Sequence, residues 1–321
     1  MDRFVKFLSG RDRQWLMGFA ILWVIAFHFC MYGNLLRIDV LNFLFGKGYL
    51  GVDIFFFLSS YGLCYSYCKR STSEYYRQRA KRLFPMYLIF VLVLVICFKS
   101  LLPFSPWLSA LLQLTGAASF TGMEVEWYIP ALIVLYALFP LIFKGVRALY
   151  SRSCIYVILL ILLLVIAAPF ISKGVFYLFA IRFPIIIIGI AAYLAVQASD
   201  EKGLLAVLSA SAIIGFCFSG REMLNGSQTG MLVLPLILYG VSQIGMKLPA
   251  GNAMAFCGRH SLEIYLAQNL ALNQFYANFD NIGFIEKTAM AIVIIAAGSV
   301  VLYYSQTLFY KLFEAADKKS K

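Results

Sequence analysis

The feature that most limits the fold of this chain is a series of long apolar runs. Residues 15–32 and 154–172, for example, contain no Asp, Glu, Lys or Arg. An α-helix needs about 20 apolar residues to cross a bilayer, whereas a membrane β-strand needs only about 9–11. The runs exceed strand length, and lipid cannot satisfy an open backbone. We therefore predict membrane-spanning α-helices.

Composition agrees with this prediction. Hydrophobic residues make up 62% of the 321 residues and charged residues 13%. A soluble domain is usually about 45–50% apolar and about a quarter charged. The sequence therefore predicts an all-α, polytopic integral membrane protein. Its formal charge of +12 would suggest nucleic-acid binding in a soluble protein, but here the basic residues sort to one side of the membrane, and we expect no nucleic-acid partner.

Apolar runs bounded by charged or turn residues predict about ten transmembrane helices in one domain, residues 1–321, with short cytoplasmic tails at 1–14 and 311–321. Segment 107–120 is too short and too rich in Ser and Gly to span, and we expect it to be re-entrant or interfacial. No cleavable signal peptide is expected. The predicted spans are 15–32, 49–67, 83–102, 127–143, 154–172, 175–197, 203–220, 229–246, 260–278 and 288–310.

The distribution of Lys and Arg predicts the orientation. With the N-terminus in the cytoplasm, 20 of the 27 basic residues fall on the cytoplasmic side and 6 outside, with Arg182 inside a span. Positive charge favours the cytoplasmic side, and an even number of spans returns the chain there. Both termini are therefore expected in the cytoplasm.

Two ionisable residues lie in the first two predicted spans, near the same outer level. His28 is one of only two His in the chain, and Asp53 opens the second span. Charged and titratable groups at membrane depth are costly and usually functional. An Asp that accepts from one imidazole nitrogen would leave the other free as a general base. The alternative is that the two residues only join their helices by a hydrogen bond.

Further polar residues are expected in the same outer half. Glu126 lies at the start of the fourth predicted span, and Arg182 lies about 10 Å below the outer end of the sixth. Arg182 is either a buried counter-ion for Asp53 or Glu126, or a group that stabilises an oxyanion or holds an acceptor. The two roles are compatible.

The cytoplasmic side carries a basic cluster in loop 68–82. Arg79 and Arg82 are three residues apart at the start of the third span, so they share a helix face. Guanidinium groups bind phosphate well. Composition alone does not separate a phosphorylated donor from anionic lipid headgroups, which attract the same residues.

Five sequence blocks, in this order, together resemble the type 3 family of membrane acyltransferases, which includes bacterial O-acetyltransferases of surface polysaccharides. The first, WLMGFAILWVIAFH, ends at His28, and GYLGVDIFFFLSSYGL contains Asp53 and Ser59. RAKRLFPMYL contains Arg79 and Arg82. The last two are EWYIPALIVLYALFPLI, with Glu126 and Trp127, and GRHSLEIYLAQN, with Gln268.

The resemblance implies transfer of an acyl group, usually acetyl, from acyl-CoA to a hydroxyl of a carbohydrate at the outer face. It assigns catalysis to His28 and donor binding to Arg79 and Arg82. We add Asp53 and Glu126 to the catalytic candidates. Residues expected to contact substrate are Arg182, Trp127, Ser59 and Gln268. Ser59 is expected to pack or hydrogen-bond rather than act as a nucleophile.

Two positions depart from the family pattern. Met17 stands where the family usually has Arg, and Arg13, one turn earlier, is the candidate to replace it in donor binding. Gln268 stands where the family has a late His, and an amide keeps hydrogen bonding but carries no proton at neutral pH.

Two other readings stay open: a transporter or flippase for a lipid-linked sugar, and a catalytically silent relative that acts as a partner in an envelope complex. Intramembrane His, Asp and Arg also occur in transporters, although no repeat relates the two halves of this chain. The seven Cys form no recognisable metal site, so no metal is expected. Expected partners are acyl-CoA, a carbohydrate acceptor and membrane lipids, in a bacterial cytoplasmic membrane; homo-oligomerisation is left open.

Overall fold

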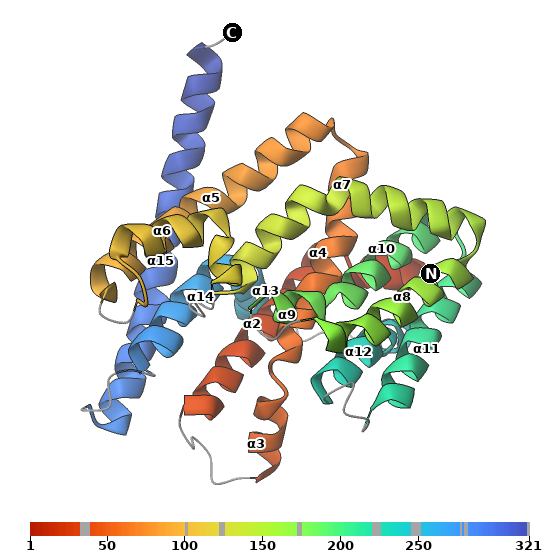
Figure 1. The fold of residues 1–321 in the computed structure, drawn as a ribbon, viewed down its shortest axis with the longest axis horizontal. Helices are drawn as coiled ribbons and strands as arrows, with labels where there is room; N and C mark the ends of the chain where they lie inside the picture. Colours follow the sequence, from red (N-terminus) through yellow and green to blue (C-terminus); the bar gives the residue numbers. More distant parts are fainter. Residues whose placement is uncertain are drawn as a thin grey trace. The chain divides into compact units, whose positions relative to one another are not determined.

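The structure is a computed structural model, and the regular elements of the residues that it describes are all helices (Figure 1). This confirms the predicted all-α class. The chain divides into two compact units, which are described separately below. The residues that the structure describes are 1–32, 39–99, 102–121, 126–171, 175–219, 226–244, 252–276, 278 and 282–319.

The first unit comprises Met1–Phe27, Leu36–Arg70 and Leu138–Arg259. Its central helix is α10, which contacts α4, α8, α11 and α12 and is buried along most of its length. A helix that is apolar all round is expected at such a central position. The helices of this unit, two of them shared with the second, are α1 (Asp2–Phe7), α2 (Gly10–Tyr32), α3 (Asp39–Gly46), α4 (Leu50–Cys68), α7 (Tyr128–Arg152), α8 (Cys154–Ala167), η3 (Ala168–Phe170), α9 (Val175–Ala180), α10 (Phe183–Gln197), α11 (Glu201–Phe218), α12 (Gly226–Ile244) and α13 (Asn252–Arg259).

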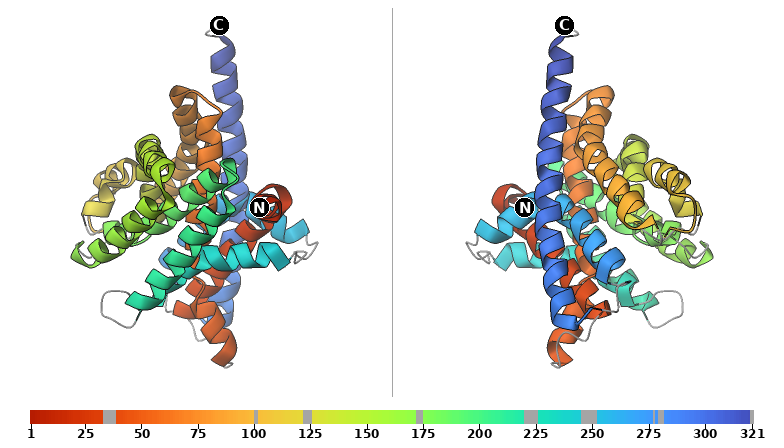
Figure 2. Two further views of the ribbon diagram at one scale, coloured as in Figure 1. Left: turned by 90° about the vertical axis from the view of Figure 1, so that its right-hand side faces the viewer. Right: turned by 90° about the vertical axis from the view of Figure 1, so that its left-hand side faces the viewer.

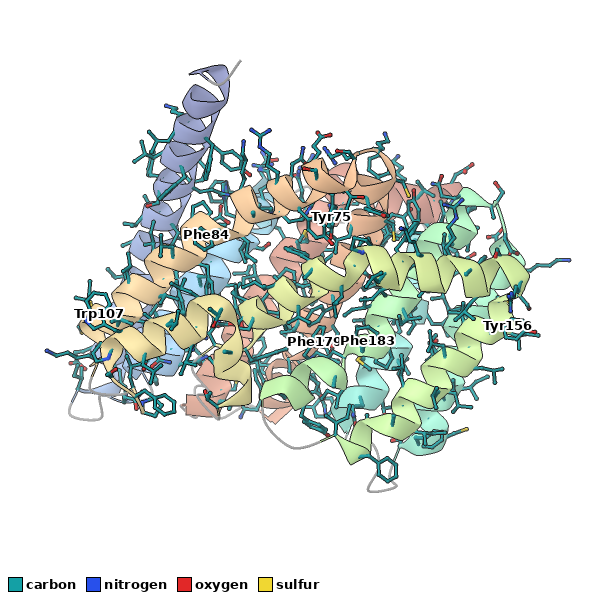
Figure 3. All side chains as sticks on the ribbon, turned by 45° about the horizontal axis from the view of Figure 1, so that its top comes forward. Tyr75, Phe84, Trp107, Tyr156, Phe179 and Phe183 are labelled. Atoms are coloured by element: carbon teal, nitrogen blue, oxygen red, sulfur yellow. The ribbon has the colours of Figure 1, made fainter. Side chains whose placement is uncertain are left out.

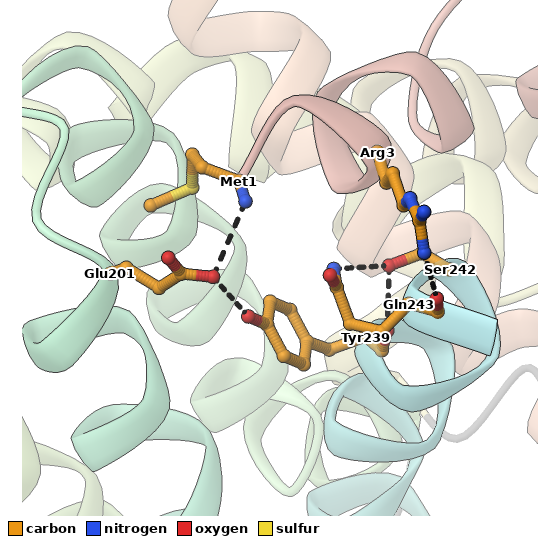
Figure 4. Close-up of polar contacts among 6 residues, drawn as sticks. All are labelled: Met1, Arg3, Glu201, Tyr239, Ser242 and Gln243. Atoms are coloured by element: carbon orange, nitrogen blue, oxygen red, sulfur yellow. Dashed lines mark hydrogen bonds and ion pairs between the residues drawn. The ribbon is translucent and has the colours of Figure 1, made fainter. Parts of the chain in front are cut away.

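The short helix α1 is fastened to α11 and α12 by polar contacts (Figure 4). The amine of Met1 lies 3.3 Å from Glu201 Oε1, and the Tyr239 hydroxyl donates to the same oxygen at 2.6 Å. Arg3 donates to the carbonyl of Gln243 at 2.7 Å. These bonds hold the first residues of the chain against α11 and α12.

The second unit comprises His28–Leu35, Ser71–Ala137 and His260–Lys321. Helix α5 contacts α6, α14 and α15, and α14 continues into a π-helix that also packs on α15. Figure 2 shows α15 as one long unbroken helix. The helices that lie wholly in this unit are α5 (Thr72–Cys97), α6 (Pro106–Thr115), η2 (Ala117–Phe120), α14 (Ser261–Gln268), the π-helix η4 (Asn269–Tyr276) and α15 (Phe284–Lys319).

Among the described residues, 7 helices are long and apolar enough to cross a membrane. These candidate spans are Gly10–Met31, Val40–Cys68, Thr72–Cys97, Tyr128–Arg152, Tyr177–Gln197, Glu201–Phe218 and Ile285–Phe313. Two of them, Val40–Cys68 and Tyr177–Gln197, join two consecutive helices across a short turn. Two shorter apolar helices, Cys154–Ala167 and Gln228–Ile244, match two further predicted spans. The chain is thus a multi-pass helical membrane protein, while the count of ten and the cytoplasmic termini stay predictions.

Two segments predicted as cytoplasmic loops are mostly helical. Helix α5 begins at Thr72, well before the predicted span, because Ser71 caps it by accepting from the Glu74 amide at 3.2 Å. This Ser-x-x-Glu pattern is the signature of a capping box. Helix α7 likewise continues to Arg152. Segment 107–120 forms the 10-residue helix α6 and a 3₁₀ turn, which is too short to span.

The predicted span 175–197 is not one continuous helix. Helix α9 ends at Ala180, and α10 begins at Phe183. Pro184 explains the interruption, because its ring would clash with the carbonyl of Ala180 in a continuous helix, whereas Pro is well tolerated in a first turn. Phe179 and Phe183 flank the break, with ring centroids 5.9 Å apart (Figure 3).

Candidate functional site

The break between α9 and α10 places Arg182 against Asp53, inside the first unit. Arg182 Nε lies 3.1 Å from Asp53 Oδ1, and the two side chains are 9% and 1% exposed. Arg182 Nη1 also donates to the carbonyl of Leu178 at 3.1 Å. Of the two roles considered for Arg182, the structure shows the counter-ion of Asp53.

Helices α4 and α10 approach closely about two helical turns along the chain from this ion pair. Gly189 packs against Ser60 and lies near the carbonyl of Phe57. Ser60 is fully buried and donates to the same carbonyl at 2.9 Å. Its neighbour Ser59 is half-buried in α4. Ser60 therefore has the packing role that the sequence suggested for Ser59.

Arg13 also points at α4. Its Nη2 donates to the carbonyl of Leu58 at 3.2 Å. A Cβ added to Gly62 would lie 2.8 Å from the same nitrogen, so the glycine makes room for the guanidinium. This bond uses part of the hydrogen-bonding capacity of Arg13, and its role in donor binding stays a prediction.

In the second unit, Glu126 is the centre of a buried hydrogen-bond network. Its Oε1 accepts from the backbone amides of Tyr128 at 2.7 Å and Ile129 at 3.2 Å, and from the Tyr265 hydroxyl at 3.1 Å. Its Oε2 accepts from Asn269 Nδ2 at 2.7 Å. The carboxylate therefore caps the start of α7 and joins it to α14 and the π-helix.

Burial changes the acidity of this carboxyl group. Glu126 is 2% exposed, and desolvation raises its pKa from an ordinary 4.5 to about 7, although the hydrogen bonds from Tyr128, Ile129 and Tyr265 act in the opposite direction. A carboxyl group with a pKa near neutrality can both take up and release a proton at working pH.

Two glutamines lie buried in the same unit. Gln113 on α6 accepts a hydrogen bond from the Tyr87 hydroxyl at 2.8 Å, while its Nε2 has no partner among the residues that the structure describes. Gln268, the last residue of α14, has no partner at Oε1 or Nε2 within the described residues. Both side chains are 0% exposed.

The predicted donor-binding residues Arg79 and Arg82 lie on α5, in the second unit. The Arg79 guanidinium is placed over two aromatic rings, 5.7 Å from the centroid of Tyr75 and 5.9 Å from that of Tyr136. Such stacking holds the flat group in one orientation. Arg82 is exposed, and its carbonyl accepts from Gln306 on α15 at 3.3 Å.

His28 lies in the last turns of α2 and belongs to the second unit, whereas Asp53 belongs to the first. The pairing of His28 with Asp53 stays a prediction. His28 is half-buried, and the next residue, Phe29, packs edge-on against Tyr276 at the end of the π-helix, with centroids 5.8 Å apart. Trp127 packs edge-on against Tyr128, with centroids 6.0 Å apart.

Sequence reasoning missed Tyr265 and Asn269 as partners of Glu126. The signal available was their place in the block GRHSLEIYLAQN, where they are four residues apart and so share a helix face. Nothing in the sequence indicated that this face meets Glu126, more than a hundred residues earlier.

These features define a class, a multi-pass helical membrane protein that buries paired and hydrogen-bonded acidic groups in or beside its spans. The family model described as "Acyltransferase domain", for the type 3 acyltransferases, matches residues 14–305, and the chain belongs to this family. The resemblance seen in the five blocks is thereby confirmed. No curated protein and no solved structure matches the chain.

Proposed function

We propose that this acyltransferase moves an acyl group, most simply acetyl, from cytoplasmic acyl-CoA to a hydroxyl of a cell-surface or lipid-linked carbohydrate. The observation that carries the proposal is the family match over residues 14–305, with His28 at the family's histidine. We assign the protein to a bacterial cytoplasmic membrane.

In the proposed reaction, His28 acts as a general base. It takes the proton of the acceptor hydroxyl as the hydroxyl oxygen attacks the thioester carbonyl carbon. The carbon–sulfur bond then breaks, and the proton passes to the leaving sulfur, which departs as CoA thiol. Asp53 is the proposed partner that orients the imidazole. This sequence is direct transfer; in the alternative, a protein nucleophile first takes the acyl group and releases CoA thiol, and the acceptor hydroxyl then attacks the acyl-enzyme.

Each of the other candidate residues is assigned to the part of the substrates that its side chain can bind. Arg79 and Arg82 carry the positive charge that the phosphates of CoA require, and Arg79 is already oriented by Tyr75 and Tyr136. Arg13 is an auxiliary donor-binding group. Glu126 is assigned with His28 and Asp53 to catalysis, and contacts with substrate are assigned to Arg182, Trp127, Ser59 and Gln268.

The two histidines of the chain provide a matched experiment. Purified protein in detergent micelles is supplied with acetyl-CoA, and release of CoA thiol is measured for wild type, His28→Ala and His260→Ala. His260 lies 3.5 Å from Glu263 and packs edge-on against Tyr303, so its loss changes local packing without removing the proposed base. We expect a loss of about 100- to 10,000-fold for His28→Ala and near-normal turnover for His260→Ala.

Other outcomes favour the alternatives. Substrate flux in proteoliposomes that survives His28→Ala, without thioester turnover by wild type, would favour a transporter. Absence of both activities, with a co-purifying envelope protein, would favour a silent relative, to which the replacements at Met17 and Gln268 point.

A further inference from the structure

Gln268 is a buried polar side chain whose hydrogen-bonding groups are unused. Its side chain is 0% exposed, and Oε1 and Nε2 both lack a partner among the described residues. A primary amide can donate two hydrogen bonds and accept two. Burying such a group without partners is unfavourable, so proteins rarely retain one without a reason.

The residues next to Gln268 are hydrogen-bonded, although the Gln268 amide itself has no partner among the described residues. Its neighbours Tyr265 and Asn269 both donate to Glu126, at 3.1 and 2.7 Å. The helix changes from α to π geometry directly after Gln268. π-segments are rare and are frequently found at functional sites. Two independent features, the unused amide and the π-helix, thus coincide at one residue.

The chemistry of Gln268 limits what it can bind. Because it offers a donor and an acceptor together, it is complementary to a group that also has both. An anion could accept from Nε2 but would leave Oε1 without a donor. A secondary amide satisfies both atoms at once, because its carbonyl accepts from Nε2 and its N–H donates to Oε1.

We propose that Gln268 binds a secondary amide group of a substrate inside the second unit. The inference rests on the proposed function, which supplies two sources of this group. The pantetheine arm of acyl-CoA carries two secondary amides between its phosphates and its thioester. An acetamido sugar acceptor carries one. Arg79, Arg82 and His28 belong to the same unit as Gln268. This agrees with a donor whose phosphates bind the two arginines and whose thioester reaches His28.

The proposal predicts opposite effects on stability and on activity. Gln268→Leu replaces the unused amide with an apolar group of similar size. In the absence of substrate, this change should raise the apparent Tm by about 2–4 °C, because a buried unsatisfied group is removed. The same change should raise the KM for acetyl-CoA about tenfold if the donor is the source. Gln274→Leu, a change of the same kind on the π-helix at a side chain that is 7% rather than 0% exposed, is the control.

Simplified substrates identify the source. For the donor, S-acetyl-N-acetylcysteamine, which has one secondary amide, is compared with S-propyl thioacetate, which has none. For the acceptor, methyl N-acetyl-β-glucosaminide is compared with methyl β-glucoside. Wild type should prefer the amide-bearing member of one pair, and Gln268→Leu should lose that preference. Gln268→Met provides a second, more flexible apolar variant should the Leu variant not fold.

Several results would overturn the inference. A fall in the Tm of both Gln268 variants would mean that the amide stabilises the free protein. Unchanged preferences for both pairs, with wild type turning over acetyl-CoA, would reject the amide site and leave the proposed function intact. Absence of acetyl-CoA turnover by wild type would reject the proposed function itself and, with it, the inference.

Discussion

Arg182 Nε lies 3.1 Å from Asp53 Oδ1, and this buried ion pair joins the break between α9 and α10 to the first turn of α4. Taking two charges out of water is costly, and a pair repays the cost only when both partners are present. The Arg182 side chain reaches Asp53 from the turn that Pro184 creates. A helix-breaking proline and an intramembrane charge are thus parts of one arrangement.

Removing one member of this pair should be much worse than removing both. Asp53→Leu or Arg182→Met alone leaves an uncompensated buried charge and is expected to cost about 3–5 kcal/mol of unfolding free energy. The double variant Asp53→Leu/Arg182→Met should recover most of that loss. Unfolding of the four proteins in mixed micelles gives the coupling energy directly. Additive losses in the double variant would show that the pair is not coupled.

Glu126 should make stability depend on pH. Its pKa of about 7 in the folded chain exceeds its ordinary 4.5, so the folded protein holds the proton more tightly than the unfolded chain. The stability that it contributes is therefore full below about pH 4.5 and is lost as pH rises through about 7, by up to about 3 kcal/mol. Apparent Tm measured from pH 4.5 to 8 should fall across this window.

The matched variant for this prediction is Glu126→Gln. Its amide oxygen still accepts from the Tyr128 and Ile129 backbone, so the start of α7 stays capped. Between pH 4.5 and 8, the apparent Tm of this variant should fall less than that of wild type, because the titration of Glu126 is removed. Parallel profiles for the two proteins would assign the pH dependence to other groups.

Part of this structure could be predicted from the sequence because its causes are local. Apolar runs gave the all-α membrane class, and motif order gave the family. The early start of α5 was readable in Ser71 and Glu74, but the density of charge in that segment favoured a loop. Pro184 marked the break beside Arg182, although hydropathy alone favoured one continuous span.

The rest depended on contacts between distant segments. The bonds from Tyr265 and Asn269 to Glu126 join residues 139 and 143 positions apart. No local period or cap encodes which helix faces will meet. For the same reason the unused amide of Gln268 is invisible in the sequence, since any Gln in an apolar run could find a partner on a neighbouring helix.

Donor binding should depend on the shape of Arg79 as well as on its charge. Arg79→Lys keeps the charge but loses the planar group that lies over Tyr75 and Tyr136. We expect the KM for acetyl-CoA to rise about tenfold in Arg79→Lys and about 100-fold in Arg79→Ala/Arg82→Ala, since each charge-assisted bond to phosphate contributes about 1.5–3 kcal/mol.

Steady-state thiol release at two salt concentrations tests this expectation. The wild-type KM should rise with salt, because screening weakens contacts between charges. Arg152→Ala, at an exposed site on α7 in the first unit, is the control for loss of a surface charge. An unchanged KM in the double variant, with the fold intact, would remove the assigned role of Arg79 and Arg82.

The close packing of α4 on α10 should make one helical glycine indispensable and leave another free to change. A Cβ added to Gly189 would overlap Ser60 Oγ and come within 2.9 Å of the Phe57 carbonyl oxygen, so the two helices would have to separate. A Cβ added to Gly145 on α7 meets nothing within 4 Å. Gly189→Ala should therefore lower the unfolding free energy by about 1–3 kcal/mol. Gly145→Ala should raise it by up to about 1 kcal/mol, since Ala favours the helix. Apparent Tm values of both variants in the same detergent decide the matter, and a Gly189→Ala protein as stable as wild type would show that the helices are not held at this distance.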